Sequence, residues 1–386
     1  MRYKLGEICE IVSGSTPKTG VPEYWDGNIK WITPAELNED SYIIKDSARK
    51  ITELGVRKTG LSSFPAGTVI LSSRAPIGKV AIAGCEMYCN QGFKNLICSE
   101  KINNRYLFWF LKGRTEYLNS LGRGATFKEI SKQIVASIEI NVPGIKEQED
   151  AVQILERTSK LIKLRKRELE ELDNLIKARF VEMFGDPKIN EKNWNKGVIA
   201  DYFEVKGGKR IPKGMDYSVV VTNHPYLRAT DMKNETILDD DIHYIGEDVF
   251  QHIKRYTVQG GDIYLTNVGV NLGMAGVIPE KFSGANLTEN AVKLVPKTDK
   301  FRGIFIANYI NSPGIQDYIN ERKMAVGVPK LAIFRIETMP LIIPPIEKQD
   351  EFASFRAQVD KSKAVIQKSL EEAQLLFDSL MQQYFG

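Results

Sequence analysis

The sequence is poor in residues that bind metals or form disulfides. It has four cysteines and three histidines in 386 residues. The cysteines are Cys9, Cys85, Cys89 and Cys98, and the histidines are His224, His243 and His252. The two sets lie in opposite halves of the chain, whereas a zinc site needs two nearby pairs of ligands. A chain of this size also folds without disulfides. We therefore expect incidental or buried thiols and no metal site.

Long apolar runs are missing as well. No stretch of about eighteen consecutive apolar residues, the length that crosses a bilayer, occurs in the chain. The opening Met1-Arg-Tyr-Lys-Leu-Gly-Glu lacks the apolar core of a secretory signal. The apolar fraction of 42% and the charged fraction of 26% are typical of soluble globular proteins. We expect a cytoplasmic protein of two or three domains.

Motifs for catalysis are also absent. The sequence has no Gly-x-x-x-x-Gly-Lys-Ser/Thr phosphate loop, so ATP-driven work would belong to a partner. An amino-methyltransferase needs an Asn/Asp-Pro-Pro-aromatic loop, but the pair Pro344-Pro345 is flanked by isoleucines. Asp186, Glu204 and Lys206 could suggest a Mg²⁺ nuclease, yet the first half has no counterpart of Glu204 and Lys206. We predict no catalytic residue, no metal and no cofactor on this chain.

What the sequence does contain is a long internal repeat. Residues 140–185 recur, without a gap and 201 positions later, as residues 341–386. Identical pairs include Pro143 and Pro344, Gln148 and Gln349, Phe184 and Phe385, and Gly185 and Gly386. A period this long indicates duplicated domains, because solenoid units are only a few tens of residues long.

Each copy of the repeat predicts one long helix. Each begins at a proline and then runs for more than thirty residues without Pro or Gly. Apolar residues recur every seven positions, which is typical of a coiled coil, and dense flanking charge leaves a stripe suited to another helix rather than to a broad domain core. We predict that the two helices pair antiparallel. The predicted seam consists of Leu155, Ile162, Leu169, Leu172 and Ile176 in the first helix and Val359, Ile366, Leu370, Ala373, Phe377 and Leu380 in the second.

The segments before the two helices correspond more loosely. Each starts with a short apolar strand that leads into a polar, glycine-containing loop, and each continues with a turn, a β-rich strand, a return strand and a helix. The scaffolds match while the loops differ, as expected for a duplicated recognition module. The predicted fold is α+β, with two mixed α/β domains separated by two long helices. The predicted division is a globular domain at 1–140, a helical segment at 141–192, a second globular domain at 193–340 and a second helical segment at 341–386.

In this order of segments the chain resembles the specificity subunits of type I restriction-modification systems over its whole length. The motifs that carry the resemblance are Leu5-Gly-Glu-Ile, Gly14-Ser-Thr-Pro, Trp31-Ile-Thr-Pro-Ala-Glu-Leu, Asn90-Gln-Gly, the Pro-x-x-x-x-Gln starts at Pro143 and Pro344, and Phe184-Gly-Asp-Pro. The second domain departs from the first, with Val326-Gly-Val-Pro-Lys in place of Gly124-Ala-Thr-Phe-Lys. Because the second domain departs from the pattern at this point, we do not expect the two domains to share one target sequence.

The resemblance implies a non-catalytic subunit that recognises double-stranded DNA. Each globular domain, a target-recognition domain, would read one half of a bipartite, asymmetric site, and the helices would set the spacing and dock two copies of a DNA adenine methyltransferase. A motor-nuclease restriction subunit would complete the complex, with S-adenosylmethionine, ATP and Mg²⁺ bound by the partners. Two alternatives remain open: a scaffold that only assembles proteins through its helices, and the recognition subunit of a related type IIB-like system that cuts on both sides of its target.

Candidate DNA-binding residues lie in matching loops of the two domains. Base edges are read by Arg, Lys, Asn, Gln, Ser or Thr, while further cations and hydroxyls contact phosphates. The net charge of +4 is compatible with DNA binding without proving it. In the first domain the candidates are Ser13, Ser15, Thr16, Lys18, Ser72, Ser73, Arg74, Lys79, Arg123, Thr126 and Lys128. In the second they are Lys206, Lys209, Arg210, Lys213, Arg228, Thr230, Thr266, Asn267, Asn271, Arg322, Lys323 and Lys330. Tyr24, Trp25 and Trp31 are interpreted as a small aromatic core.

Overall fold

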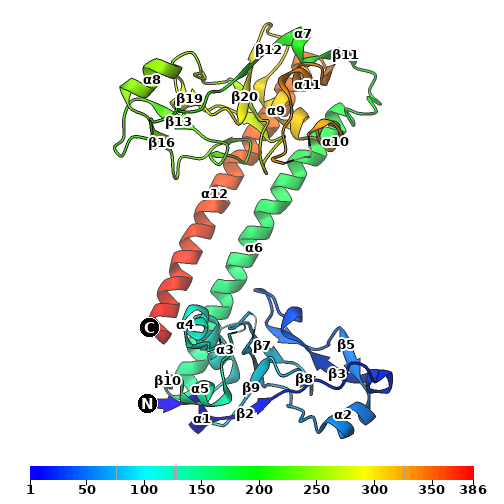
Figure 1. Cartoon of the computed structure of the whole chain (residues 1–386), viewed down its shortest axis with the longest axis vertical. Coiled ribbons are helices and arrows are strands. Elements are labelled where there is room, and N and C mark those ends of the chain that lie inside the picture. The colour runs from blue at the N-terminus through cyan, green and yellow to red at the C-terminus, as the bar shows by residue number, and fades with distance from the viewer. Residues whose placement is uncertain (75, 125–127, 325–326) are drawn as a thin grey trace. The chain divides into compact units, whose positions relative to one another are not determined.

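The computed structural model of the chain describes residues 1–74, 76–124, 128–324 and 327–386 (Figure 1). The chain divides into two compact units. The first comprises Met1–Lys166 with Lys368–Gly386, and the second comprises Arg167–Gln367. Both boundaries fall inside long helices, so each unit contains one globular domain and part of each helix. The predicted domain limits at 140, 192 and 340 stay predictions. Among the described residues, no helix has the length and apolar character needed to cross a membrane.

The first globular domain alternates short strands and helices. Its strands are β1 (Arg2–Lys4), β2 (Cys9–Ser13), β3 (Trp25–Ile32), β4 (Ile43–Ile44), β5 (Arg49–Ile51), β6 (Val69–Ser72), β7 (Val80–Ala83), β8 (Tyr88–Cys89), β9 (Phe93–Cys98) and β10 (Glu139–Asn141). Its helices are α1 (Leu5–Ile8), α2 (Glu53–Thr59), α3 (Asn104–Lys112), α4 (Thr115–Leu121) and α5 (Lys132–Ser137). The long helix α6 (Ile145–Phe184) follows.

The second globular domain repeats this plan. Its strands are β11 (Asn195–Val198), β12 (Phe203–Gly207), β13 (Pro225–Leu227), β14 (Met232–Lys233), β15 (Thr236–Ile237), β16 (His243–Tyr244), β17 (Ile263–Thr266), β18 (Ala275–Val277), β19 (Asn286–Leu287), β20 (Ala291–Pro296) and β21 (Pro340–Ile343). Its helices are α7 (Ile199–Tyr202), α8 (Glu247–Ile253), α9 (Gly303–Asn311), α10 (Pro313–Arg322) and α11 (Ile333–Glu337). The second long helix is α12 (Ile346–Phe385).

The two domains share most of their sheet topology, although within the described residues the main sheet has a fifth strand only in the first domain. The main sheet has the order β2-β9-β6-β7-β4 in the first domain and β12-β20-β17-β18 in the second. A smaller three-stranded sheet has the order β5-β3-β8 in the first and β16-β13-β19 in the second. The first strand of each domain pairs with the last, as β1 with β10 and β11 with β21. The duplication inferred from the helices thus extends through both globular domains.

Each main sheet lies between two apolar clusters. In β6, Val69 and Leu71 pack with the residues of α3, while Ile70 packs with Ile32 and Phe64 on the other side. In β17, Ile263 and Leu265 join the cluster of α9, while Tyr264 packs into a separate cluster. Side chains of a strand alternate between its two faces, so these continuous apolar runs are explained by a sheet that is covered on both sides.

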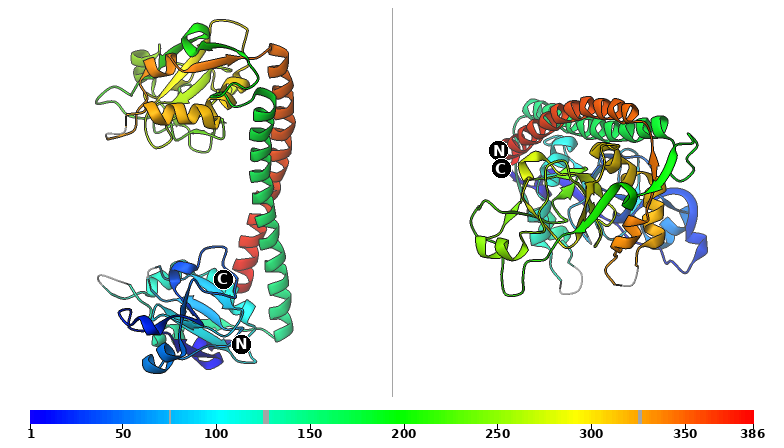
Figure 2. Two further views of the ribbon diagram at one scale, coloured as in Figure 1. Left: turned by 90° about the vertical axis from the view of Figure 1, so that its right-hand side faces the viewer. Right: turned by 90° about the horizontal axis from the view of Figure 1, so that it is seen from above.

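The two long helices run antiparallel beside each other within each unit (Figures 1 and 2). In the second unit Asp173 pairs with Lys363 and Arg179 with Glu351, so rising numbers in α6 meet falling numbers in α12. In the first unit the Arg165 Nε atom lies 3.2 Å from Ser369 Oγ. The predicted fold class, mixed α/β domains with an antiparallel pair of long helices, is confirmed.

The predicted seam residues contact the partner helix and also the cores of the globular domains. Leu155, Ile162, Ile176, Val359 and Ala373 are buried, and the other six predicted seam residues are half-buried. Leu155 belongs to the core that contains α3, and Ile176 and Val359 belong to the core that contains α9. The helices therefore pair with each other and also cover the domain cores, because bulky residues such as Phe180 widen the apolar stripe near the domains.

The repeated glutamine anchors each long helix to its own domain. Gln148 and Gln349 are both fully buried. The Gln148 Oε1 atom accepts from the Asn103 N–H group at 2.8 Å, and its Nε2 atom donates to the carbonyl oxygens of Lys101 and Pro143. Gln349 makes the same three hydrogen bonds, with Arg302, Lys300 and Pro344 in the equivalent positions. The Pro-x-x-x-x-Gln motif is thereby explained as a clamp between the helix start and the loop before α3 or α9.

Replacing either clamp glutamine is expected to destabilise its unit. Gln148→Leu and Gln349→Leu keep the side-chain size but leave buried backbone groups without partners, each costing about 1–3 kcal/mol. The free energy of unfolding, measured by urea denaturation, should fall by about 2–5 kcal/mol. Gln153→Leu, at an exposed position of the same helix, should change it by less than about 0.5 kcal/mol. Equal effects of the buried and exposed substitutions would contradict the clamp.

Candidate DNA-binding loops

Four polar segments meet beside the main sheet of the first domain. The loop after β2 is tied to β8 by a hydrogen bond from Ser15 N to Cys89 O at 3.0 Å. In the β6–β7 turn, Ser73 N donates to Gly92 O at 2.8 Å, and Ile130 N donates to Ser73 O at 3.0 Å. The loops around 15, 73, 92 and 130 are therefore adjacent although they lie far apart in the sequence.

The second domain builds the same cluster. Lys209 N donates to Leu287 O at 2.8 Å, Asn267 N to Asn290 O at 3.0 Å, and Leu331 N to Asn267 O at 2.8 Å. These bonds connect the loop after β12, the β17–β18 turn, the segment before β20 and the loop before α11. The matching loops predicted from the sequence are thus brought together in each domain by backbone hydrogen bonds.

Several candidates are used to hold the loops rather than to face solvent. Ser72, Ser73, Thr266 and Asn267 are buried. The Ser72 Oγ atom accepts from Lys79 N at 2.8 Å, as the Thr266 Oγ1 atom accepts from Met274 N at 3.0 Å. The Lys79 ammonium donates to the Pro34 carbonyl oxygen at 3.1 Å. These five side chains shape the turns that present their exposed neighbours.

The remaining candidates of the first domain are exposed or partly exposed. They are Ser13, Ser15, Thr16, Lys18, Arg74, Arg123 and Lys128, and Thr126 lies outside the described residues. Thr16 contacts Gln91, a residue of the Asn90-Gln-Gly motif. Hydroxyls and cations thus line the outer side of the cluster, which suits contacts to bases and phosphates.

Arg74 is held by an acid that the sequence reasoning missed. Its Nε atom lies 3.1 Å from Glu129 Oε2, and the other oxygen of Glu129 lies 3.2 Å from the Lys94 Nζ atom. The Lys94 side chain is only 8% exposed and also reaches Ser73 Oγ at 3.3 Å. The sequence could have drawn attention to Glu129, because it directly follows the candidate Lys128. Lys94 lies inside an apolar strand, and nothing in the sequence indicated a role for it. Glu129 therefore forms an ion pair with Arg74 and another with the buried Lys94 ammonium.

In the second domain the candidates fall into several groups. Lys206, Lys209, Arg210, Lys213, Thr230 and Lys330 are exposed, and Asn271 is partly exposed. Arg210 pairs with Glu289, and this hydrogen bond raises the pKa of the Arg210 guanidinium. Arg228 is bound to Asp231 at 2.6 Å and to Asp241 at 3.0 Å. The bond to Asp231 raises the pKa of Arg228, and the bond from Arg228 lowers the pKa of Asp241. Arg228 is thus already neutralised by the domain itself.

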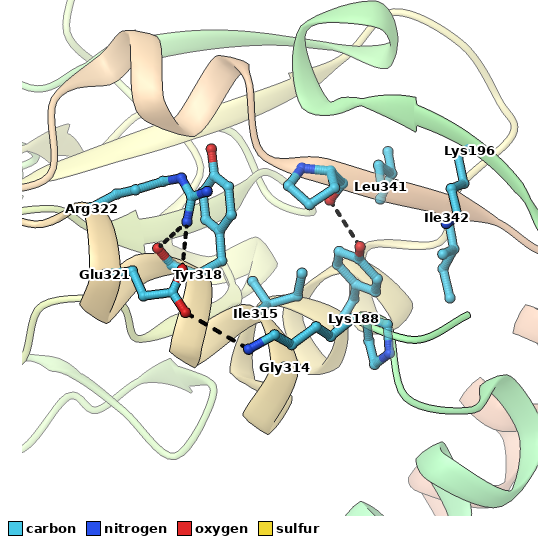
Figure 3. Close-up of a pocket in the computed structure, with 12 residues that line it drawn as sticks. Lys188, Lys196, Gly314, Ile315, Tyr318, Glu321, Arg322, Leu341 and Ile342 are labelled. Atoms are coloured by element: carbon cyan, nitrogen blue, oxygen red, sulfur yellow. Dashed lines mark hydrogen bonds and ion pairs between the residues drawn. The ribbon is translucent and has the colours of Figure 1, made fainter. Parts of the chain in front are cut away.

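Arg322 lies in a different environment from the other candidates. It stacks on Tyr318, with its Cζ atom 3.9 Å from the ring centroid, and pairs with Glu321 at 3.0 Å. These side chains line a pocket of about 220 Å³ together with Lys188 (Figure 3). The Lys188 Nζ atom lies 3.7 Å from Glu321 Oε1, so charges of opposite sign meet inside the pocket. Lys323, next in the chain, donates to Asn320 at 2.7 Å.

Tyr24, Trp25 and Trp31 lie together in one apolar cluster of the first domain. Trp25 and Trp31 are buried, with ring centroids 5.1 Å apart in an edge-to-face arrangement, and Tyr24 packs against the same cluster. The prediction of a small aromatic core is confirmed. Cys9, Cys85, Cys89 and Cys98 are free thiols. Within the described part of the chain, no three His, Cys, Asp or Glu side chains are grouped closely enough to hold a metal ion.

Comparison with known proteins assigns the family. The family model described as "Type I restriction modification DNA specificity domain" matches residues 1–174 and again residues 191–375. The chain belongs to this specificity family. The resemblance inferred from the sequence motifs is therefore confirmed, and the two matches show that the specificity domain occurs twice.

Individual members of the specificity family are similar over much of the chain. The type I restriction enzyme MjaIX specificity subunit of Methanocaldococcus jannaschii is 32% identical over 303 residues, which cover 73% of this chain and 70% of the relative. A type I S subunit from M. genitalium superposes with a TM-score of 0.61 at 14% identity, covering 100% of this chain and 96% of the other. A chain from a structural study of complex assembly in the type I R-M system superposes with a TM-score of 0.62 at 16% identity, covering 100% of this chain and 97% of the other. At these identities the structural matches establish the fold alone.

Proposed function

We propose that this chain is the non-catalytic DNA-recognition subunit of a type I restriction-modification complex, with each globular domain reading one half of a bipartite, asymmetric site. The observation that carries the proposal is that one loop cluster occurs twice on a largely shared sheet topology, with different side chains exposed on it. Two domains that share a scaffold but differ in their loops are suited to recognising two different half-sites. Base methylation, cleavage and ATP-driven motion would then belong to partner subunits that bind S-adenosylmethionine, ATP and Mg²⁺.

Mapping of methylated adenines tests this proposal. A host that carries the chain with its methyltransferase should show one motif made of two short specific sequences and a gap of fixed length, because the helices are proposed to set the spacing. Deleting the chain while keeping the methyltransferase should remove methylation at that motif. Unchanged methylation would leave the protein-assembly scaffold as the better interpretation. Cleavage on both sides of the motif would instead indicate a type IIB-like complex.

The long helices carry a surface that suits two identical partners. Leu164 and Val365 occupy equivalent positions of the repeat and are 46% and 71% exposed. Leu175 and Leu376 form a second equivalent pair, at 48% and 53% exposure. Leu164 and Leu376 belong to the first compact unit, and Leu175 and Val365 belong to the second. Exposed apolar side chains that recur in this way support the docking of two copies of a methyltransferase subunit, one on each unit.

A negative charge at Leu175 or at Leu376 is expected to prevent the binding of one of the two methyltransferase copies. Leu175→Glu and Leu376→Glu should each weaken one docking site by about tenfold or more, so that native mass spectrometry finds one bound copy for either variant and none for the double variant. Asn174→Glu introduces the same charge at a neighbouring exposed position and should keep two copies. Retention of both copies by the double variant would rule out this docking surface.

A further inference from the structure

The two loop clusters carry different chemistry at equivalent backbone positions. In the first domain Arg74 and Arg123 both form β-bridges with Glu129. In the second domain Val268 and Met324 both form β-bridges with Lys330. The bridging pattern aligns Arg74 with Val268 and Arg123 with Met324, independently of any sequence alignment. Where the first domain has two arginines, the second has a half-buried valine and an exposed methionine.

The apolar side chains of the second cluster are unusually exposed. Val270 is 97% exposed, Val328 is 66% exposed and Met324 is 62% exposed. Val270 belongs to the β17–β18 turn, while Met324 and Val328 belong to the loop before α11. Exposing three apolar side chains on one small surface is unfavourable in water, so this surface has the character of a contact site.

Backbone hydrogen bonds hold this apolar surface in place. Gly269 N donates to Pro329 O at 2.9 Å, and Met324 N donates to Lys330 O at 2.8 Å. Leu272 N closes the turn on Gly269 O at 3.1 Å. A loop constrained in this way presents its side chains without a large loss of entropy on binding. The exposed Lys330 adjoins the same surface and supplies positive charge for a phosphate.

We infer that the second domain recognises thymine by apolar contact with its 5-methyl group in the major groove, through Val270 and Val328. The inference rests on the proposed function and specifies how one half-site is read. Among the four bases, thymine alone offers a methyl group in the major groove, and small apolar side chains are its usual contacts. A guanidinium such as that of Arg74 instead donates hydrogen bonds to guanine, so the two domains differ in the kind of base contact they make.

Replacement of thymine by deoxyuridine tests the inference, because it removes the methyl group and keeps base pairing. Once the motif is mapped and the second half-site assigned, duplexes with one such replacement at a time are bound to the complex purified through a tag on this chain. At one or more positions the wild-type complex should bind the uridine duplex about fourfold more weakly. With Val270→Ala and Val328→Ala combined, thymine and uridine duplexes should bind equally. Val181→Ala, at an exposed position of α6 to which no binding role is assigned, should keep the fourfold ratio.

The outcomes separate this inference from the proposed function. If scrambling the second half-site abolishes tight binding but no uridine replacement matters, the proposed function stands and the methyl contact is wrong. A second half-site without thymine on either strand leads to the same conclusion. If scrambling itself has no effect, the proposed function fails instead. Since Val270 and Val328 are exposed, unfolding of the double variant is not expected, and an unchanged circular dichroism spectrum checks this.

Discussion

Replacing residues 193–340 by the second domain of another family member is expected to change one half of the methylated motif and to leave the other half unchanged. The loops of the second cluster are closed by hydrogen bonds among residues of that domain alone, such as Lys209 with Leu287 and Asn267 with Leu331. The first cluster is likewise closed by its own residues. Each domain therefore closes its own loop cluster, and if each cluster reads one half-site as proposed, methylation mapping should give a hybrid motif.

The junctions of this exchange can be chosen from the structure. Asn195 pairs with Ile343 at one end of the β11–β21 ladder, so both ends of the exchanged segment lie next to one two-stranded sheet. The incoming domain must also meet the Gln349 clamp, which binds the backbone of Lys300 and Arg302. The reciprocal exchange of residues 1–140 is the matched control and should change the other half-site. A change in both halves from either exchange would show that the domains do not read independently.

Arg74→Ala is expected to abolish discrimination at one base pair of the first half-site. A bidentate contact from arginine to guanine contributes about 1–3 kcal/mol of discrimination, so binding to the cognate sequence should fall by about 5- to 150-fold. Glu129→Gln should reduce discrimination at the same base pair by a smaller factor. This variant removes the ion pair of Arg74 with Glu129, but the Arg74 guanidinium is still present to contact the base. The measurement is a competition of duplexes substituted at each position of the half-site.

Three comparisons separate base recognition from simple charge. Arg74→Lys keeps the positive charge but loses the fork of donors, so it should resemble Arg74→Ala in specificity. Arg57→Ala removes the same charge from an exposed position of α2 and should leave specificity intact. If Arg74→Ala weakens binding to every sequence alike and lowers the salt slope by about one, Arg74 contacts a phosphate instead.

The long helices were predictable from the sequence because their signals are local. Forty residues without Pro or Gly define each helix, and the heptad spacing marks the buried stripe. What the pattern did not show is that Leu155 and Ile176 also join the domain cores. A helix stripe records which face is buried, but it does not record how many partners cover that face.

The candidate site was predictable only in outline. The structure brings the matching loops together in each domain, but Ser72 and Thr266 are buried at the ends of β6 and β17, and Arg228 is paired with two aspartates. Composition does not distinguish these residues from exposed neighbours such as Arg74 or Lys330. Glu129 and Lys94 were missed because their role depends on Arg74, which lies 55 and 20 residues away in the chain.

By itself the sequence determined that the chain is duplicated, that two long helices carry the repeat, and that polar loops differ between the copies. These properties follow from periodicity and from residues close together in the chain. Only the tertiary structure decided which loop side chains are exposed, which cations are already paired, and that the equivalent positions of the two clusters carry arginines in one domain and apolar side chains in the other. Those outcomes depend on backbone hydrogen bonds between distant loops, and such pairings leave no local signal in a single sequence.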